Sequence, residues 1–206
     1  MKVVLETERL VLRQFTVADA EYLLHMEREP DVLRYVGRKP LADIDAYRNK
    51  IQITFLPFYD KPGGYGPCAI IEKISAEFVG GCSLRPGTDS NFAAEMGFGP
   101  DEAEMGYGLR KPSWGRGYAT ELAQALVRRA FTELGAISVV ACVTVDNLAS
   151  VRVLEKAGLR PAVEPLYLPG ENELSVKYAL TKDQFLQRGG APPIPLTFRN
   201  PACYRD

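Results

Sequence analysis

Several features that define large classes of proteins are missing or rare in this sequence. Histidine occurs only once, as His25. This excludes histidine-dependent catalytic triads and metal sites built from several histidines, and we expect His25 to be a structural residue of the first helix. No apolar run approaches the roughly 20 residues that a membrane-spanning helix needs. The first six residues, MKVVLE, also lack the form of a secretory signal peptide.

An excess of charge of one sign is missing too. The sequence has 25 Lys and Arg against 26 Asp and Glu, for a formal net charge of -1. This balance gives no reason to expect a nucleic acid or an anionic membrane as a partner. Cysteine is also rare, with Cys68, Cys82, Cys142 and Cys203 scattered along the chain. Three of them lie in apolar, strand-like segments, which favours free buried thiols in a reducing cytoplasm over disulfides or zinc, and we expect no metal.

The remaining composition is that of a single globular domain. The 206 residues are 46% hydrophobic, which suffices for one substantial core. From Gly189 the sequence GGAPPIPLTFRNP is rich in proline and glycine and offers no core of its own. We therefore expect one domain over residues 1–188 and a C-terminal tail over residues 189–206.

The most informative stretch is EMGYGLRKPSWGRGYAT, over residues 104–120. Its first part alternates with period two and predicts a strand, with Glu104 on the same face as the two glycines that follow. Two glycines on one face indicate that something approaches that face closely. Residues 114–119 then form a glycine-rich turn that opens an amphipathic helix. Such a helix start offers free backbone N–H groups to a phosphate or diphosphate, although the P-loop and dinucleotide motifs are absent.

The rest of the chain predicts a mixed sheet with helices. Strands are expected over residues 10–15, 68–71, 78–84, 104–109, 137–143 and 173–180. Helices are expected over residues 16–27, 31–36, 43–55 and 119–134, and from residue 146 or 147 to 157. Gly135 is expected to cap the C-terminus of the fourth helix, and Gly158 to end the fifth. The strand–helix–strand order from residue 104 implies a right-handed parallel crossover, whereas the earlier strands favour antiparallel hairpins.

A second motif, VDNLASVRVLEKAGL, occupies residues 145–159. It resembles the N-x-x-S/A-x-x-x-x-x-K-x-G-F signature of the GNAT superfamily of N-acetyltransferases. Trp114-x-x-Gly117-x-Ala119 resembles the acyl-CoA loop of the same superfamily, Q/R-x-x-G-x-G/A, at its last two positions. The tryptophan at the first position, together with ERLVLR at residues 8–13, resembles the RimJ/RimL-type branch. The resemblance covers about residues 5–180.

This resemblance implies the GNAT fold, an α/β structure whose central mixed, twisted sheet is splayed between its fourth and fifth strands and flanked by helices. It implies acetyl-CoA as the co-substrate, lying where residues 104–109 part from residues 137–144. The pantetheine arm would bond the backbone near Tyr107 and Leu109 and the side chain of Asn147. The diphosphate would lie on the loop, at Gly115, Arg116, Gly117, Tyr118, Ala119 and Thr120. Arg116 can equally be a plain surface residue, and Asn147 a plain helix N-cap.

Direct acetyl transfer needs an unprotonated amine, so a base must accept a proton directly or through water. Glu104 is the candidate base, because it lies on the strand joined to the loop and the RimJ/RimL branch often has Glu there. Glu95 is its rival, since EMGFG nearly repeats EMGYG. Many relatives assist the leaving thiolate with a tyrosine at the position of Leu154, and Ser150 resembles the substitute for it. Glu104 can alternatively position the substrate, and Ser150 can satisfy the helix start.

The function implied is transfer of acetyl from acetyl-CoA to a primary amine, either a protein N-terminus or a small molecule, without a covalent enzyme intermediate. The acceptor pocket is expected from residues 16–55, 57–66 and 86–103. A non-catalytic acyl-CoA-binding module is the alternative, and a kinase-like enzyme is disfavoured because Walker residues and metal-binding carboxylate pairs are missing. The expected partner is the amine acceptor, with no nucleic acid and no membrane, and a homodimer stays open.

Overall fold

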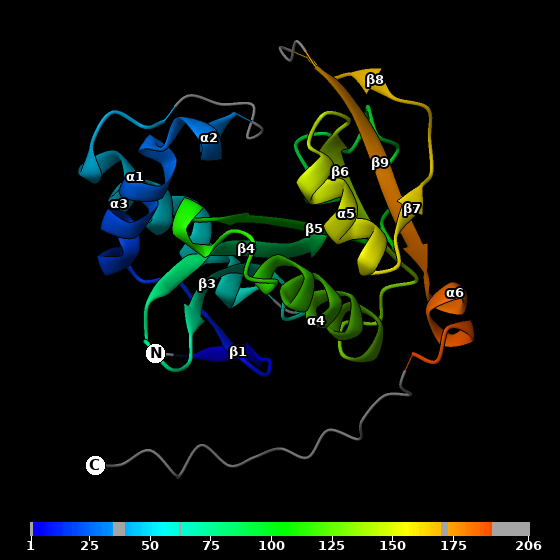
Figure 1. Cartoon of the computed structure of the whole chain (residues 1–206), viewed down its shortest axis with the longest axis horizontal. Helices are drawn as coiled ribbons and strands as arrows, with labels where there is room; N and C mark the ends of the chain where they lie inside the picture. The colour runs from blue at the N-terminus through cyan, green and yellow to red at the C-terminus, as the bar shows by residue number, and fades with distance from the viewer. Residues whose placement is uncertain (1, 35–39, 62, 170–172, 191–206) are drawn as a thin grey trace.

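The computed structural model describes residues 2–34, 40–61, 63–169 and 173–190, and one twisted sheet forms its centre (Figure 1). The strands are β1 (Val3–Glu6), β2 (Leu10–Arg13), β3 (Gly66–Glu72), β4 (Phe78–Pro86), β5 (Glu102–Leu109), β6 (Ser138–Thr144), β7 (Arg160–Pro161), β8 (Leu166–Tyr167) and β9 (Leu174–Thr181). Within the described residues their order is β1-β2-β3-β4-β5-β6-β9-β7, with β8 also paired to β9. Among the strands that the structure describes, only β5 and β6 pair in parallel. The expected mixed α/β sheet is confirmed.

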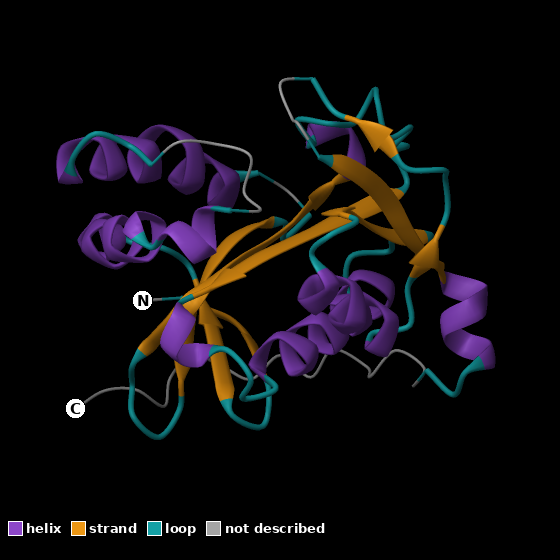
Figure 2. Cartoon of the chain, turned by 45° about the horizontal axis from the view of Figure 1, so that its top comes forward, coloured by secondary structure: helices purple, strands orange, loops and turns teal. Residues whose placement is uncertain are grey.

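Helices cover both faces of this sheet (Figure 2). They are α1 (Ala20–Arg28), α2 (Pro30–Leu33), α3 (Ile44–Lys50), α4 (Tyr118–Thr132), α5 (Leu148–Lys156) and α6 (Lys182–Gln187). Side chains alternate along β3, so that Ile70 joins the core under α4 with Leu122, whereas Ala69 joins a second core with α1 and α3. The two cores therefore hold α4 on one face of the sheet and α1 and α3 on the other.

The sheet opens between β5 and β6. Parallel pairing joins residues 102–104 to residues 138–140 and then stops. β5 continues to Leu109 along β4, and β6 continues to Thr144 along β9, so each strand keeps its outer partner. Beyond Glu104 and Val140 the two strands no longer pair with each other, and we call this part of the sheet the opening. β5 and β6 correspond to the fourth and fifth strands of the sequence prediction, because β1 was not expected. The predicted splay between those two strands is therefore confirmed.

Local signals set the ends of the helices beside the opening. Gly117 precedes α4 with a φ of 82°, and Gly135 follows its C-terminus with a φ of 72°. These are left-handed conformations that glycine adopts without a steric cost. Asn147 caps α5, and Gly158 follows it with a φ of 100°. The predicted starts and stops of both helices agree with the structure to within two residues.

Some elements differ from expectation. The helix expected over residues 43–55 widens into a π-helix at Ile51–Phe55, and the helix expected from Thr16 begins with a 3-10 turn at Val17–Asp19. β1, β7, β8 and α6 were not expected, and β7 and β8, with two residues each, are too short to show a period. Residues 35 and 36 of one expected helix, and residues 191–206 of the tail, lie outside the described residues. No described helix combines the length and apolar character needed to cross a membrane.

Candidate active site

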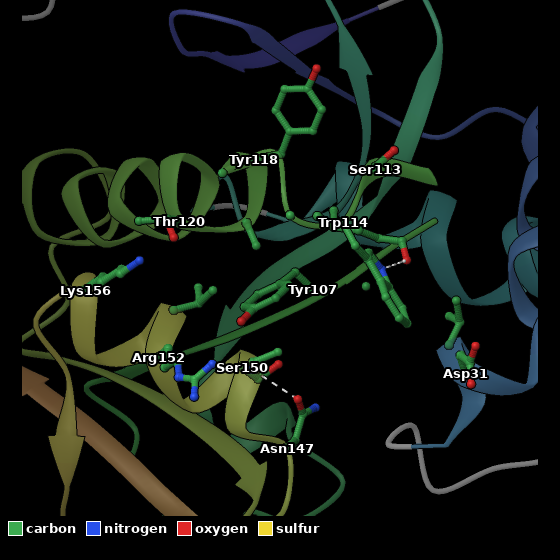
Figure 3. Close-up of a pocket in the computed structure, with 18 residues that line it drawn as sticks. Asp31, Tyr107, Ser113, Trp114, Tyr118, Thr120, Asn147, Ser150, Arg152 and Lys156 are labelled. Atoms are coloured by element: carbon green, nitrogen blue, oxygen red, sulfur yellow. Dashed lines mark hydrogen bonds between the residues drawn. The ribbon is translucent and has the colours of Figure 1, made fainter. Parts of the chain in front are cut away.

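A cavity of about 430 Å³, the first cavity, lies at the opening (Figure 3). Its walls are the end of β5, the loop over residues 110–117 (the α4 loop), the start of α4 and one face of α5. It is lined by nine predicted site residues: Tyr107, Leu109, Gly115, Gly117, Tyr118, Ala119, Thr120, Asn147 and Ser150. The other two predicted residues, Glu104 and Arg116, do not line it. Segments far apart in the sequence thus form one site.

The α4 loop leaves its backbone amides free. Gly115 and Gly117 have φ values of 71° and 82°, which turn the chain tightly before α4 begins. None of the N–H groups from residue 115 to residue 120 donates a hydrogen bond to another described residue. The first N–H groups of a helix have no partner within it and carry the positive end of its dipole. The loop therefore has the properties of a diphosphate site.

The N-terminal segment holds this loop in place. The Arg9 guanidinium donates from Nε to Glu121 Oε2 at 2.7 Å and from Nη1 to the Arg116 carbonyl at 2.9 Å. The guanidinium groups of Arg9 and Arg116 lie 4.7 and 4.8 Å from the centre of the Tyr118 ring. The Tyr118 side chain is therefore buried away from the cavity (Figure 3). Arg116 is exposed, as a plain surface arginine would be.

β5 presents backbone groups to the first cavity. The Arg110 N–H bonds to the Val79 carbonyl of β4 at 2.9 Å. Because backbone groups alternate along an antiparallel strand, those of Tyr107 and Leu109 point the other way, toward the opening. The Trp114 indole already donates to the Leu109 carbonyl at 2.9 Å. The backbone of Tyr107 and the N–H of Leu109 are therefore available to pair with an extended ligand.

The two glycines of β5 lie on the face opposite to Tyr107, and of the two only Gly108 has open space beside it. A Cβ atom at Gly108 would come no closer than 4.0 Å to Met26 of α1, and one at Gly106 would lie 3.3 Å from the Ser83 hydroxyl. The close approach expected on this face is therefore not made by protein backbone. It occurs instead on β4, where a Cβ atom at Gly80 would lie 2.2 Å from the Gly108 carbonyl.

A second cavity of about 170 Å³ also lies at the opening and contains Glu104. Glu104 is only 5% exposed, and Arg85, its partner in register on β4, donates a hydrogen bond from Nε to its carboxylate. The sequence analysis missed Arg85, because the register between two strands cannot be read from either strand alone. Glu95 is exposed in a turn and lines neither cavity. A buried, paired carboxylate in a cavity is the stronger candidate for a base.

Three residues, Tyr107, Asn147 and Ser150, line both cavities and so mark their junction. Asn147 Oδ1 accepts a hydrogen bond from the Ser150 N–H at 3.1 Å (Figure 3). This is the N-cap role that was one of the two expectations for Asn147. The Tyr107 hydroxyl is buried and makes no hydrogen bond of ordinary geometry with any described residue. Burial raises the pKa of Tyr107, and the neighbouring Ser150 side chain opposes this shift.

Sequence analysis also missed two cations of the first cavity, Arg152 and Lys156 of α5. They lie four residues apart, so they share one face of the helix, and both are exposed. Figure 3 shows them on the side of the cavity that faces the start of α4. Their spacing was a readable signal, because Ala149, Arg152, Val153 and Lys156 recur three and four residues apart and so share one helical face.

Of the three segments expected to supply the acceptor pocket, two contribute residues to the cavities at the opening and one does not. α2 reaches the first cavity with Asp31 and Val32, and Phe92, from the segment 86–103, lines the second cavity. The loop over residues 57–66 lies at a separate cavity of about 140 Å³ beside Arg129 and lines neither cavity at the opening. His25 is an exposed residue of α1, outside both cavities.

The described residues also show which metal-ligating side chains and cysteines lie near the site. In the part of the chain that the structure describes, no three side chains of metal-ligating type form a cluster. Cys68 and Cys82 are free thiols. Cys142 lines the second cavity, whereas Cys68 and Cys82 lie opposite each other on β3 and β4.

A splayed mixed sheet with free amides at a helix N-terminus beside the opening has the form of a binding site for a diphosphate-containing ligand. The model of the acetyltransferase (GNAT) domain family matches residues 9–160. The chain is 31% identical over 150 residues to p20, an uncharacterised N-acetyltransferase of Bacillus licheniformis, covering 73% of this chain and 78% of p20. It is 29% identical over 191 residues to FsC-acetyl coenzyme A-N(2)-transacetylase of Aspergillus fumigatus, covering 89% and 78%.

Among solved structures, the fold is shared by spermidine N-acetyltransferase from Vibrio cholerae in complex with CoA and spermine. The TM-score is 0.67 at 16% identity, and the match covers 86% of this chain and 98% of that chain. The chain belongs to the GNAT family of acetyltransferases, whose members bind acetyl-CoA or CoA. It is therefore an acyl-CoA-dependent acetyltransferase. The alternative of a non-catalytic acyl-CoA-binding module is not favoured.

Proposed function

We propose that this protein is a RimJ/RimL-type N-acetyltransferase that moves an acetyl group from acetyl-CoA directly to a primary amine. The observation that carries the proposal is the junction of two cavities at the opening. The first contains the free amides of Gly115 and of residues 117–120, and the second contains Glu104. A donor held in the first cavity can therefore present its acyl group to an amine in the second.

The residues of the first cavity fit acetyl-CoA in their chemistry. The N–H groups of the α4 loop and of the first turn of α4 would bind the diphosphate. Arg152 and Lys156 would add positive charge for the phosphate groups of CoA. The free backbone groups of Tyr107 and Leu109, with the amide of Asn147, would bind the pantetheine arm.

Glu104 would act as the base. An amine of the lysine type, with an ordinary pKa of about 10.4, is almost fully protonated at neutral pH and cannot attack. A carboxylate that accepts this proton, directly or through water, supplies the reactive amine. Arg85 supports the role because the hydrogen bond from its Nε fixes the position of the buried carboxylate. The amine nitrogen then bonds to the acetyl carbon, the carbon–sulfur bond breaks, and Ser150 stabilises the leaving sulfur.

The acceptor would be a primary amine on a protein N-terminus or a small molecule. The second cavity, at about 170 Å³, is smaller than the ~300 Å³ or more that encloses a whole ligand, so it would admit only the amine-bearing end. Its apolar walls include Phe92 and Leu168, which suit a short alkyl chain next to the amine. Spermidine, named for the Vibrio cholerae enzyme, is a molecule of this kind, and the RimJ/RimL likeness points to protein N-termini.

The proposal extends to organisation and location. We place one catalytic domain over residues 1–188, because α6 packs onto α4 through Phe185 and Phe131, whose rings lie 5.0 Å apart. Residues 189–206 are then a tail outside it. Cys68 and Cys82 lie opposite each other on β3 and β4 and are free thiols, which suits a reducing cytoplasm.

An acceptor screen tests the proposal. Acetyl-CoA is incubated with peptides that have free N-termini, with polyamines, with lysine peptides and with aminoglycosides, and released thiol is measured. We expect thiol release with at least one class, matched mole for mole by acetylated amine in mass spectra. Tight acetyl-CoA binding without acceptor-dependent thiol release from any class would contradict the proposal.

A further inference from the structure

The side chain of Tyr107 lies between the two cavities. It lines both of them, in contact with the core under α4, and strand alternation puts it on the face of β5 opposite to Glu104. The Glu104 carboxylate and the Tyr107 phenol therefore lie at the opening on opposite faces of β5. In a direct transfer the base acts on the amine, whereas a hydrogen-bond donor to the sulfur acts on the leaving group, so two separate groups can serve the two ends of the reaction.

The Tyr107 hydroxyl is unusual because it is buried without a hydrogen bond of ordinary geometry to any described residue. Leaving a buried hydroxyl unpaired is costly, so such a group in a native site calls for a partner that arrives from outside. The Ser150 side chain interacts with it and also lines both cavities. The two hydroxyl groups thus share the place where the cavities meet.

We infer that the Tyr107 hydroxyl donates a hydrogen bond to the thioester sulfur and, with Ser150, stabilises the thiolate that leaves when the amine is acetylated. This inference rests on the proposed function. Leu154, where many relatives have a tyrosine, is buried at the second cavity. β5 would therefore supply the phenol that α5 lacks.

The role is stabilisation of charge rather than proton transfer. Burial raises the pKa of Tyr107 above its ordinary value of 10.0, whereas an ordinary thiol has a pKa of about 8.5. The thiolate is therefore too weak a base to take the proton, and Tyr107 stays neutral. The nitrogen–carbon bond forms, the carbon–sulfur bond breaks with its electron pair on sulfur, and the amine proton passes to Glu104 or water. The thiolate takes its proton from water.

Tyr107→Phe keeps the ring and removes only the hydroxyl, so it is the variant that tests the inference. Tyr178→Phe on β9 is the matched control, because Tyr178 is also mostly buried but lines neither cavity. The first readout needs no acceptor: CoA is bound to each protein, and the pKa of its thiol is measured from the ultraviolet absorbance of the thiolate. We expect a bound thiol with a pKa below that of free CoA in the wild type and Tyr178→Phe, and about one unit higher in Tyr107→Phe.

The second readout is turnover. We expect kcat to fall about tenfold in Tyr107→Phe with an unchanged KM for acetyl-CoA, less than the ~10²-fold typical of an oxyanion donor because sulfur accepts hydrogen bonds weakly. An unchanged thiol pKa in Tyr107→Phe, despite normal CoA binding, would overturn the inference alone. A raised KM with normal kcat would also overturn it, since that is the result of a packing role. Failure of the wild type to bind CoA would instead overturn the proposed function on which it rests.

Discussion

Arg9 and Glu121 are joined across 112 positions of the sequence by a 2.7 Å hydrogen bond from Nε to Oε2. The Arg9 backbone N–H and the Thr7 hydroxyl donate to the other oxygen of the same carboxylate. Burial raises the pKa of Glu121, but these hydrogen bonds outweigh it and lower the pKa below its ordinary value. Since Arg9 also bonds to the Arg116 carbonyl, the N-terminal ERLVLR segment fixes the α4 loop in the conformation that leaves its amides free.

We expect Arg9→Gln to raise the KM for acetyl-CoA several-fold and to leave kcat within about twofold. The physical reason is that the loop loses its anchor, while the groups at the junction of the cavities stay in place. A loss of about 1 kcal/mol, typical of a hydrogen bond to a charged group that is partly exposed, corresponds to this change. Arg48→Gln, which breaks the exposed pair with Asp45, is the control and should change neither constant. A loss of kcat at unchanged KM would contradict the assignment of Arg9 to the loop.

The sequence was a good guide wherever the signal was local. Glycines before and after a run of apolar residues at helical spacing were enough to place α4. Both signals depend only on residues close together in the sequence, because glycine allows the left-handed cap and the apolar spacing defines the amphipathic face. The same holds for Asn147 and Gly158 around α5. Nine of the eleven predicted site residues line the first cavity for this reason, since the loop and both helix starts were correctly located.

The contacts that the sequence did not reveal are those between distant segments. Arg85 faces Glu104 only because β4 and β5 pair in one register, and a shift by one residue would turn Arg85 to the other face. Likewise the near repeat of EMGYG made Glu95 a rival to Glu104, and only the fold shows that the turn at residues 91–97 exposes Glu95. Periodicity gives the face of a residue within its own element, and only the assembled sheet gives its partners.

Gly117→Glu should weaken CoA binding by at least about tenfold. A glutamate there places negative charge at a helix start proposed to bind a diphosphate, and a side chain at a φ of 82° strains the turn. Gly135→Glu is the matched control, since it makes the same change at a φ of 72° just beyond the other end of α4. Isothermal calorimetry with CoA should show normal affinity for Gly135→Glu. Equal affinity of both variants for CoA would refute the loop as the diphosphate site.

Asp19→Asn should destabilise the fold in a way that depends on pH. Asp19 is buried and binds Arg13 through two hydrogen bonds of 2.6 and 2.7 Å. Burial raises the pKa of Asp19, but the bonds from Arg13 and Thr16 outweigh it and hold the pKa below its ordinary value of 3.8. A lowered pKa means that the stabilisation is complete above about pH 4 and is lost as the pH falls through the folded-state value.

We therefore expect Asp19→Asn to cost about 3 kcal/mol at pH 7, because it leaves the Arg13 charge buried without its partner. This difference in the free energy of unfolding should shrink below about pH 4, where the wild type loses its own ion pair. Urea unfolding of both proteins at pH 7 and near pH 3 measures it. The exposed pair of Arg48 and Asp45 supplies the control, since Asp45→Asn should cost less than about 1 kcal/mol at either pH. A gap of the same size at both pH values would exclude the ion pair as its cause.

Glu104→Gln should lower kcat at neutral pH by about 10²-fold while CoA affinity stays the same. The amide has the shape of the carboxylate but cannot accept the amine proton, and this magnitude is typical for loss of a general base. Glu95→Gln, at an exposed position outside both cavities, is the matched control and should be as active as the wild type. The pH profile of the rate separates a base from a residue that only positions the acceptor.

If Glu104 is the base, the rate of Glu104→Gln should climb as the pH rises toward the pKa of the acceptor amine, because the solution then supplies the unprotonated amine. A deficit that stays constant over this range would assign Glu104 to positioning, and a loss of activity in Glu95→Gln alone would move the base to the other carboxylate.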